Sequence, residues 1–134
     1  MEYRASHMYA RISGRKVRPV VTLIRGLSVN QALHVLEHVH RRGAYLVRKV
    51  LKSALANAQQ SADVQPAKLT VTQAVVDDGP LHQKRLRWRP AARGRVMPIR
   101  KRTSHIRIGL SETLELASSA EEHAPKAKRS QRES

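Results

Sequence analysis

Apolar residues near the start of the chain recur with the 3.6-residue period of an amphipathic helix. They are Val17, Val20, Val21, Ile24 and Leu27. Ser13 offers an N-cap for this helix, and Gly26 is expected to terminate it. Pro19 conflicts with the pattern, because proline lacks an amide donor and clashes with the preceding turn. We therefore expect either a loose turn at residues 14–17 or a regular helix that starts near Pro19.

Two further apolar blocks predict two more helices. Ser28 is expected to cap the second helix, and Gln31 completes a capping box. The buried stripe of this helix consists of Ala32, Leu33, Leu36 and Val39. Residues 41–43 are expected to break it. The third helix, from about residue 44 to 61, is interpreted as the core helix, because its helical period holds for more than three turns. Its apolar positions are Leu46, Val47, Val50, Leu51, Ala54, Leu55 and Ala58.

Three other segments predict strands. Residues 2–10 are expected to form an edge strand, and Leu69–Val76 is rich in β-branched residues. In residues 103–110, apolar side chains alternate with others, as in a half-buried strand that pairs with residues 69–76. The run Asp77–Pro80 is expected to form a turn that ends the strand or bends it into the next segment.

The segment from Gly79 to Ile108 contains ten Lys and Arg residues and no Asp or Glu. Its apolar residues are too few to cover the basic ones, so it cannot build a core of its own. Pro90 and Gly94 lie near its middle and favour a turn. We interpret residues 79–108 as a long β-hairpin that projects from a small globular body and enters nucleic acid.

Composition supports a nucleic-acid partner. The chain has 134 residues, a formal net charge of +16, a pI of about 11.5 and no cysteine. Such charge is typical of nucleic-acid binders. A membrane partner is not expected, because no run of about 20 apolar residues exists. Without a signal peptide in MEYRASHMYA, we expect a cytoplasmic protein with one domain at residues 1–112 and a flexible tail at 113–134.

The sequence supports a catalytic or metal site less well than it supports nucleic-acid binding. His34, Glu37 and His38 fit the H-x-x-E-H pattern of a zinc hydrolase, but no further protein ligand is evident and short matches recur by chance. Asp77 and Asp78 are adjacent in a strand and would point to opposite faces, so they would not share one ion. We expect no enzyme activity, metal or cofactor.

The basic hairpin differs from an ordinary solvated charge run. Arginine outnumbers lysine in it by eight to two, which favours bidentate phosphate contacts and stacking on bases. Apolar residues such as Leu86, Trp88 and Met97 are interleaved with the arginines. The hairpin is therefore interpreted as an RNA-binding element, with a DNA-binding architectural protein as the alternative.

Several motifs carry a family resemblance. They are SGRKVRPVVTLIRGLSVNQALHVL, RKVLKSALANA, VVDDGP, R-P-x-x-x-G-R and KRTSHI. In this order they resemble the universal large-subunit ribosomal protein twenty-two family over about residues 5 to 112. The resemblance implies an α+β fold with three helices packed on a small antiparallel three-stranded sheet, and a long protruding β-hairpin. It also implies a structural, non-enzymatic protein that binds large-subunit rRNA and lines the nascent-peptide exit tunnel with its hairpin.

The resemblance, together with the basic clusters, names candidate site residues and partners. Expected rRNA contacts are Arg11, Arg15, Lys16, Arg18, Arg25, Lys84, Arg85, Arg87, Arg89, Arg93, Arg95, Arg100, Lys101, Arg102, Ser104 and His105. The expected tunnel-facing tip is Arg87, Trp88, Arg89, Pro90, Ala91, Ala92, Arg93 and Gly94. Expected partners are rRNA, neighbouring proteins including large-subunit protein four, and the nascent peptide, without homo-oligomers. The outgoing arm LHQKRLRW is longer than the family pattern, and Trp88 is expected where the extra length falls.

Overall fold

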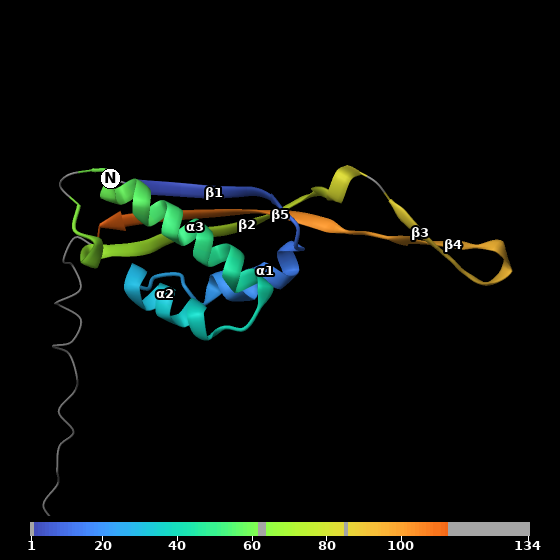
Figure 1. Cartoon of the computed structure of the whole chain (residues 1–134), viewed down its shortest axis with the longest axis horizontal. Coiled ribbons are helices and arrows are strands. Elements are labelled where there is room, and N and C mark those ends of the chain that lie inside the picture. Colours follow the sequence, from blue (N-terminus) through green and yellow to red (C-terminus); the bar gives the residue numbers. More distant parts are fainter. Residues whose placement is uncertain (1, 62–63, 85, 113–134) are drawn as a thin grey trace, which may run out of the picture.

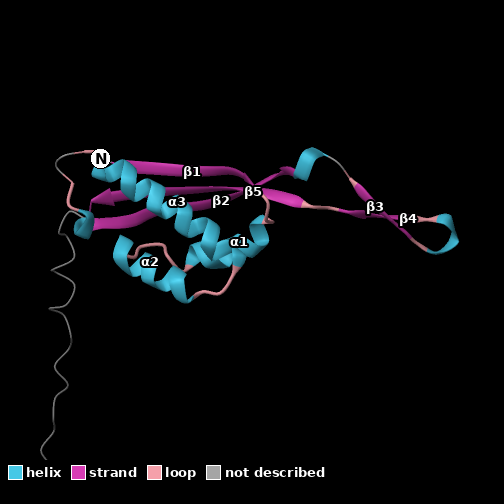
Figure 2. Cartoon of the chain, in the orientation of Figure 1, coloured by secondary structure: helices cyan, strands magenta, loops and turns pink. Residues whose placement is uncertain are grey.

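The computed structural model describes residues 2–61, 64–84 and 86–112 (Figure 1). Within these residues the helices are α1 (Gly14–Thr22), α2 (Val29–His38) and α3 (Arg42–Gln59), with short 3₁₀ turns η1 (Pro66–Lys68), η2 (His82–Lys84) and η3 (Ala92–Gly94). The strands are β1 (Glu2–Ala10), β2 (Leu69–Leu81), β3 (Arg87–Pro90), β4 (Val96–Ile99) and β5 (Arg102–Glu112). Figure 2 distinguishes these elements by type. The predicted tail, residues 113–134, lies outside the described residues.

The sheet and the helices form the predicted α+β arrangement. Strand β5 lies between β1 and β2, and both pairings are antiparallel. The three helices cover one side of this sheet (Figure 1). Apolar side chains from all three helices and all three strands are buried between them, the largest including Leu51 and Leu69. The fold class and the edge position of β1 are confirmed.

Helix α1 runs through Pro19 without a break, so both alternatives predicted for residues 14–19 are wrong. Val17, Val20 and Val21 are buried against the rest of the core. Burying these three side chains compensates for the cost of an internal proline, about 3 kcal/mol. The helix also ends earlier than predicted, at Thr22, and Gly26 lies in the following turn with a φ of 76°.

Helices α2 and α3 meet most expectations. Ser28 caps α2, and its hydroxyl accepts a hydrogen bond from the Gln31 amide at 3.4 Å. Helix α3 begins at Arg42, two residues earlier than predicted, and includes Gly43. A Cβ built at Gly43 would lie 3.5 Å from the Lys16 carbonyl oxygen and 3.6 Å from the Val17 Cα, which are ordinary contact distances. The start of α3 thus packs directly against the backbone of α1.

The run Asp77–Pro80 continues strand β2, so the predicted turn is wrong. The chain changes register between Asp78 and Leu81 without leaving β5, as a β-bulge does. The hydroxyl of Thr103, in β5, donates a hydrogen bond to the Pro80 carbonyl oxygen at 2.6 Å across this irregularity. Proline is tolerated here because its missing donor falls at a break in the ladder.

Outside the body, the hairpin consists of a short connecting part and an outer two-stranded ladder (Figure 1). We call residues 2–81 and 102–112 the body, and residues 87–99 the blade, in which β3 pairs with β4. Between them lies the joint, which has five residues in the outgoing arm (82–86) and two in the returning arm (100–101). The outgoing arm of the joint is therefore longer than the returning arm. Trp88 lies beyond the joint, opposite Pro98 in the blade ladder.

Candidate nucleic-acid interface

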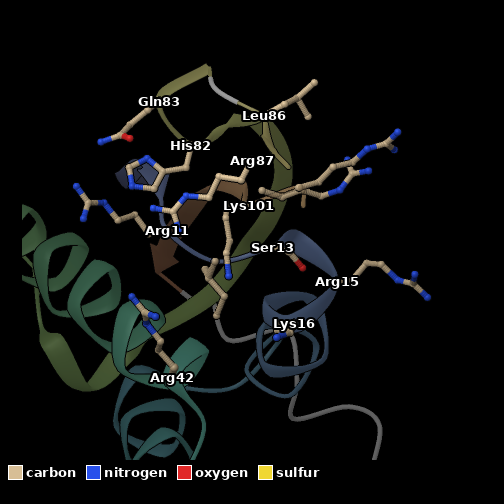
Figure 3. A pocket seen from close by; sticks show the side chains of 13 residues that line it. Arg11, Ser13, Arg15, Lys16, Arg42, His82, Gln83, Leu86, Arg87 and Lys101 are labelled. Atoms are coloured by element: carbon tan, nitrogen blue, oxygen red, sulfur yellow. The ribbon is translucent and has the colours of Figure 1, made fainter. Parts of the chain in front are cut away.

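A basic hollow lies where the hairpin leaves the body (Figure 3). We call it the root pocket. Its lining residues are Arg11, Ile12, Ser13, Arg15, Lys16, Arg42, His82, Gln83, Leu86, Arg87, Arg100, Lys101 and Arg102. Eight of these are lysine or arginine, and none is aspartate or glutamate. The charges come from the turn after β1, the starts of α1 and α3, the joint and the adjoining ends of β3 and β5. Folding thus brings together cations that are far apart in the sequence.

Two helix N-termini contribute to the root pocket. Arg15 and Lys16 lie in the first turn of α1, and Arg42 is the first residue of α3. Neither first turn contains an acidic residue. A cation near a helix N-terminus is unfavourable, because the unpaired amides there already carry partial positive charge. This arrangement is suited to binding an anion, which would interact favourably with both the side chains and the helix ends.

Carboxylates in the described part of the chain neutralise other cations. The ion pairs there join Arg4 to Glu2, Arg18 to Asp78, Arg48 to Glu37 and Arg107 to Asp77. None of these pairs includes a cation that lines the root pocket. Among the residues that the structure describes, the pocket cations therefore have no acidic partner.

Asp77 and Asp78 point to different partners, as their adjacent strand positions predict. Asp78 accepts a hydrogen bond from the Arg18 guanidinium at 2.9 Å and lies against Gly14 at the start of α1. It thus supplies the negative charge that the first turn of α1 lacks. Asp77 pairs with Arg107 of β5. Asp78 thus links β2 to α1, and Asp77 links β2 to β5, within the body.

The predicted rRNA contacts fall into several groups. Those that line the root pocket are Arg11, Arg15, Lys16, Arg87, Arg100, Lys101 and Arg102. Arg89, Arg93 and Arg95 are exposed in the blade. Arg18 is paired with Asp78, and Arg25 donates from its Nε to the Ala74 carbonyl oxygen at 2.9 Å. The side chain of Lys84 and the whole of Arg85 lie outside the described residues.

Ser104 and His105 are less accessible than the basic residues. Ser104 is fully buried, and its hydroxyl has no hydrogen-bond partner within the described structure. A direct contact between Ser104 and rRNA does not fit this burial. His105 is half-buried, and its Nδ1 accepts a hydrogen bond from the Tyr9 amide at 3.0 Å. Its ring also packs edge-on against Tyr9. Both residues act in the packing of the hairpin base.

The blade has two chemically different faces. Residues opposite each other in an antiparallel pair project to the same side of the ladder. The register pairs Arg87 with Ile99 and Arg89 with Met97, whereas the alternate pairs are Trp88 with Pro98 and Pro90 with Val96. One face therefore carries arginines and the other is uncharged. Trp88 remains 58% exposed and Val96 59%, so the uncharged face has no cover within the described chain.

The tip of the blade is a tight turn. The Ala91 amide donates to the Arg95 carbonyl oxygen at 2.8 Å, and the Arg95 amide donates to that of Ala92 at 3.3 Å. Arg93 and Gly94 both adopt positive φ, 58° and 65°. Gly94 accepts this conformation at no cost, whereas a β-carbon makes it unfavourable at Arg93. Arg93 is exposed in this turn.

The histidines of α2 do not form a metal site in the described structure. The rings of His34 and His38 lie edge-on with centres 4.6 Å apart, and His38 Nδ1 contacts the His34 carbonyl oxygen at 2.9 Å. Glu37 is directed to Arg48 at 3.5 Å. Within the described residues no three His, Cys, Asp or Glu side chains are arranged to hold a metal ion. Nor is any helix there long and apolar enough to cross a bilayer.

Six pocket residues were not predicted as site residues: Ile12, Ser13, Arg42, His82, Gln83 and Leu86. Residues 41–43 are predicted to break a helix, whereas Arg41 and Arg42 stand at the start of α3. Two cations at a helix start without an acidic neighbour are themselves a signal of an anion site. Gln83 and Leu86 belong to the joint, whose shape depends on a positive φ of 58° at Gln83. No pattern in the sequence indicates that conformation.

Comparisons with known proteins match most of this chain to one family. Residues 5–111 match the model of the family described as Ribosomal protein L22p/L17e. The large ribosomal subunit protein uL22 of Thermus thermophilus is 50% identical over 112 residues, a match covering 84% of this chain and 96% of that relative. The uL22 protein of Akkermansia muciniphila is 46% identical over 112 residues, covering 84% and 97%. That of Ligilactobacillus salivarius is 46% identical over 108 residues, covering 81% and 91%.

Proposed function

This chain belongs to the Ribosomal protein L22p/L17e family, and from this premise we propose that it is a structural, non-enzymatic rRNA-binding protein of the cytoplasmic large ribosomal subunit. The body binds rRNA at the subunit surface, and the hairpin lines the nascent-peptide exit tunnel. Its partners are large-subunit rRNA, neighbouring proteins including protein four at the tunnel constriction, and the nascent peptide. It acts by holding rRNA segments together rather than by chemistry.

The root pocket is the observation that supports this proposal most directly. Eight lysines and arginines surround one hollow that has no acidic lining, and two helix N-termini add to the positive potential. A folded RNA crowds phosphates together where its backbone turns sharply, whereas a straight duplex spaces them along a regular helix. The concave shape of the pocket therefore favours a turn in rRNA over a DNA duplex.

The two faces of the blade suggest how the hairpin is oriented in the tunnel. Arg87 and Arg89 on the basic face suit phosphate contacts with the rRNA wall. Trp88 and Val96 on the uncharged face suit the lumen, where an emerging peptide passes. Of the predicted tunnel-facing residues, Trp88 and Pro90 therefore belong to the peptide side, and Arg93 projects from the tip.

A binding experiment tests the rRNA assignment. The protein is titrated against full-length bacterial large-subunit rRNA at several salt concentrations, with duplex DNA as competitor. About eight phosphate contacts predict a log–log salt slope of very roughly −6, by analogy with single-strand and duplex values. Replacing both Lys16 and Arg42 with Gln should reduce the slope by about 1.4. Lys68→Gln, an exposed residue that does not line the root pocket, is the control and should reduce it less. Equal displacement by duplex DNA would favour the architectural DNA-binding alternative.

A cross-linking experiment tests the tunnel assignment. Photoreactive amino acids are placed at Trp88 or at Arg89 in assembled ribosomes that carry a stalled nascent peptide. The residue at position 88 should cross-link to the peptide, and the residue at position 89 to rRNA. Cross-links from both positions to rRNA alone would reject the proposed orientation of the blade.

A further inference from the structure

The outer face of α3 carries positive charge without any acidic residue. The 18-residue helix contains Arg42, Arg48, Lys49 and Lys52 and no carboxylate. Arg42, Tyr45, Lys49 and Lys52 are spaced by three, four and three residues, so they share one stripe. Val47, Leu51 and Ala54, on the opposite side of the helix, are buried. The stripe thus faces away from the core.

Tyr45 is the aromatic residue of this stripe. Its side chain is 52% exposed, and the Lys49 ammonium lies 4.7 Å from the centre of its ring. The same ammonium, through a hydrogen bond and its charge, lowers the pKa of Tyr45 from its ordinary value. The cation over the ring favours an ordered orientation of this side chain. The exposed part of the ring offers a flat apolar surface in a basic environment.

The stripe continues from the root pocket. Arg42 lines the pocket and is also the first residue of the stripe. At about 1.5 Å of rise per residue, Lys52 lies roughly 15 Å further along α3. An RNA strand that leaves the pocket past Arg42 would therefore pass over Tyr45 and then reach Lys52.

We propose that Tyr45 is a stacking platform for an unpaired rRNA nucleotide whose neighbouring phosphates contact Arg42 and Lys52. This inference rests on the proposed function and adds a particular type of RNA contact to it. Stacking requires an unpaired base, because the base faces of an A-form duplex are covered by neighbouring pairs. The absence of carboxylates along α3 favours a polyanion over a neighbouring protein, since protein surfaces offer charges of both signs.

The test compares four variants of the full chain in binding to full-length bacterial large-subunit rRNA. Tyr45→Ala should weaken binding by about 5- to 150-fold, the range measured for loss of one stacked base. Tyr45→Phe should bind like the wild type, because the ring remains. Lys52→Ala should reduce the log–log salt slope by about 0.7, whereas Tyr45→Ala should leave it unchanged. Leu23→Ala removes a side chain that is also 52% exposed but lies outside the stripe, so it should have no effect.

The outcomes separate this inference from the function on which it rests. If the wild type does not bind rRNA, the proposed function itself fails. If it binds but Tyr45→Ala binds equally well, the stacking platform is rejected, and a protein neighbour becomes the candidate occupant of the stripe. A change of salt slope in Tyr45→Ala would also reject stacking. Ultraviolet cross-linking of wild-type Tyr45 to a nucleotide of the rRNA provides a readout that does not depend on the folding of a variant, and absence of this cross-link counts against the platform.

Discussion

The body and the blade of this protein are ordered by different means. In the body, apolar side chains of three helices and three strands are buried together, and Val17, Ile24 and Leu51 are fully inaccessible. In the blade, every side chain is exposed except that of Ala91, which is half-buried. A two-stranded ladder without a buried face is marginally stable in water. The body can therefore fold by its own burial, whereas the blade needs a partner to hold it.

The largest expected effect is on the free energy of unfolding, which should fall for a substitution in the body and not for one in the blade. Leu51→Ala in the body should lower the free energy of unfolding by about 2–5 kcal/mol, because it leaves a cavity in the core. Trp88→Ala in the blade should change it by less than about 0.5 kcal/mol, because Trp88 is 58% exposed. Urea unfolding of the free protein measures both. A comparable loss in Trp88→Ala would mean that the blade packs against the body in solution.

The next largest effect is on the salt dependence of rRNA binding, which substitutions in the blade should change without affecting the stability of the body. Replacing Arg89, Arg93 and Arg95 together with Gln should reduce the log–log salt slope of rRNA binding by about 2, since each arginine is proposed to contact one phosphate. The free energy of unfolding should not fall, because none of the three is buried. Replacement of the same residues with Lys is the matched control and should retain the slope. A triple Gln variant with the wild-type slope would exclude the blade from phosphate binding.

A smaller effect is expected at the boundary between the regions. Asp78→Asn removes the ion pair with Arg18, whose side chains are 52% and 55% exposed for Arg18 and Asp78. Such exposed pairs contribute below about 1 kcal/mol, so unfolding in urea should shift only slightly. rRNA binding should become slightly more salt-dependent, because Arg18 loses its acidic partner. An unchanged salt slope would show that Arg18 does not reach the rRNA.

The smallest effect lies at the far end of the body, on β1. A hydrogen bond from Arg4 holds the pKa of Glu2 below its ordinary value of 4.5. The folded state then binds fewer protons than the unfolded state in this range. The resulting stabilisation is fully present above pH 4.5 and is lost as the pH falls through the lower folded pKa. Comparing urea unfolding of the wild type and Glu2→Gln across this range should show a difference that vanishes in acid. A difference that persists in acid would contradict this origin.

Much of the body follows from the sequence, because its helices and strands are set by the period of buried side chains. The family resemblance, the α+β fold and the capping of α2 by Ser28 are confirmed. The path through Pro19 was not predictable from local preference, because burial of α1 on the core overrides the cost of proline. The extension of β2 through Asp77–Pro80 likewise depends on pairing with β5, which lies about 30 residues away in sequence.

The structure brings some of the predicted site residues together. Seven of the predicted cations line the root pocket, and their contact with rRNA stays a prediction. Their convergence could not be predicted, since it depends on the packing of α3 against α1 and on the shape of the joint. Ser104 is an expected rRNA contact because it belongs to the KRTSHI motif. Its position in β5 buries it instead.

The unequal arms of the joint make the blade an exchangeable module. Five outgoing residues face two returning ones, so a difference in arm length is absorbed before the ladder of β3 and β4 begins. The pairing within the blade and the pairing of β2 with β5 are therefore independent of how many residues connect them. A change in the number of joint residues would therefore leave both ladders and the buried core of the body unaltered.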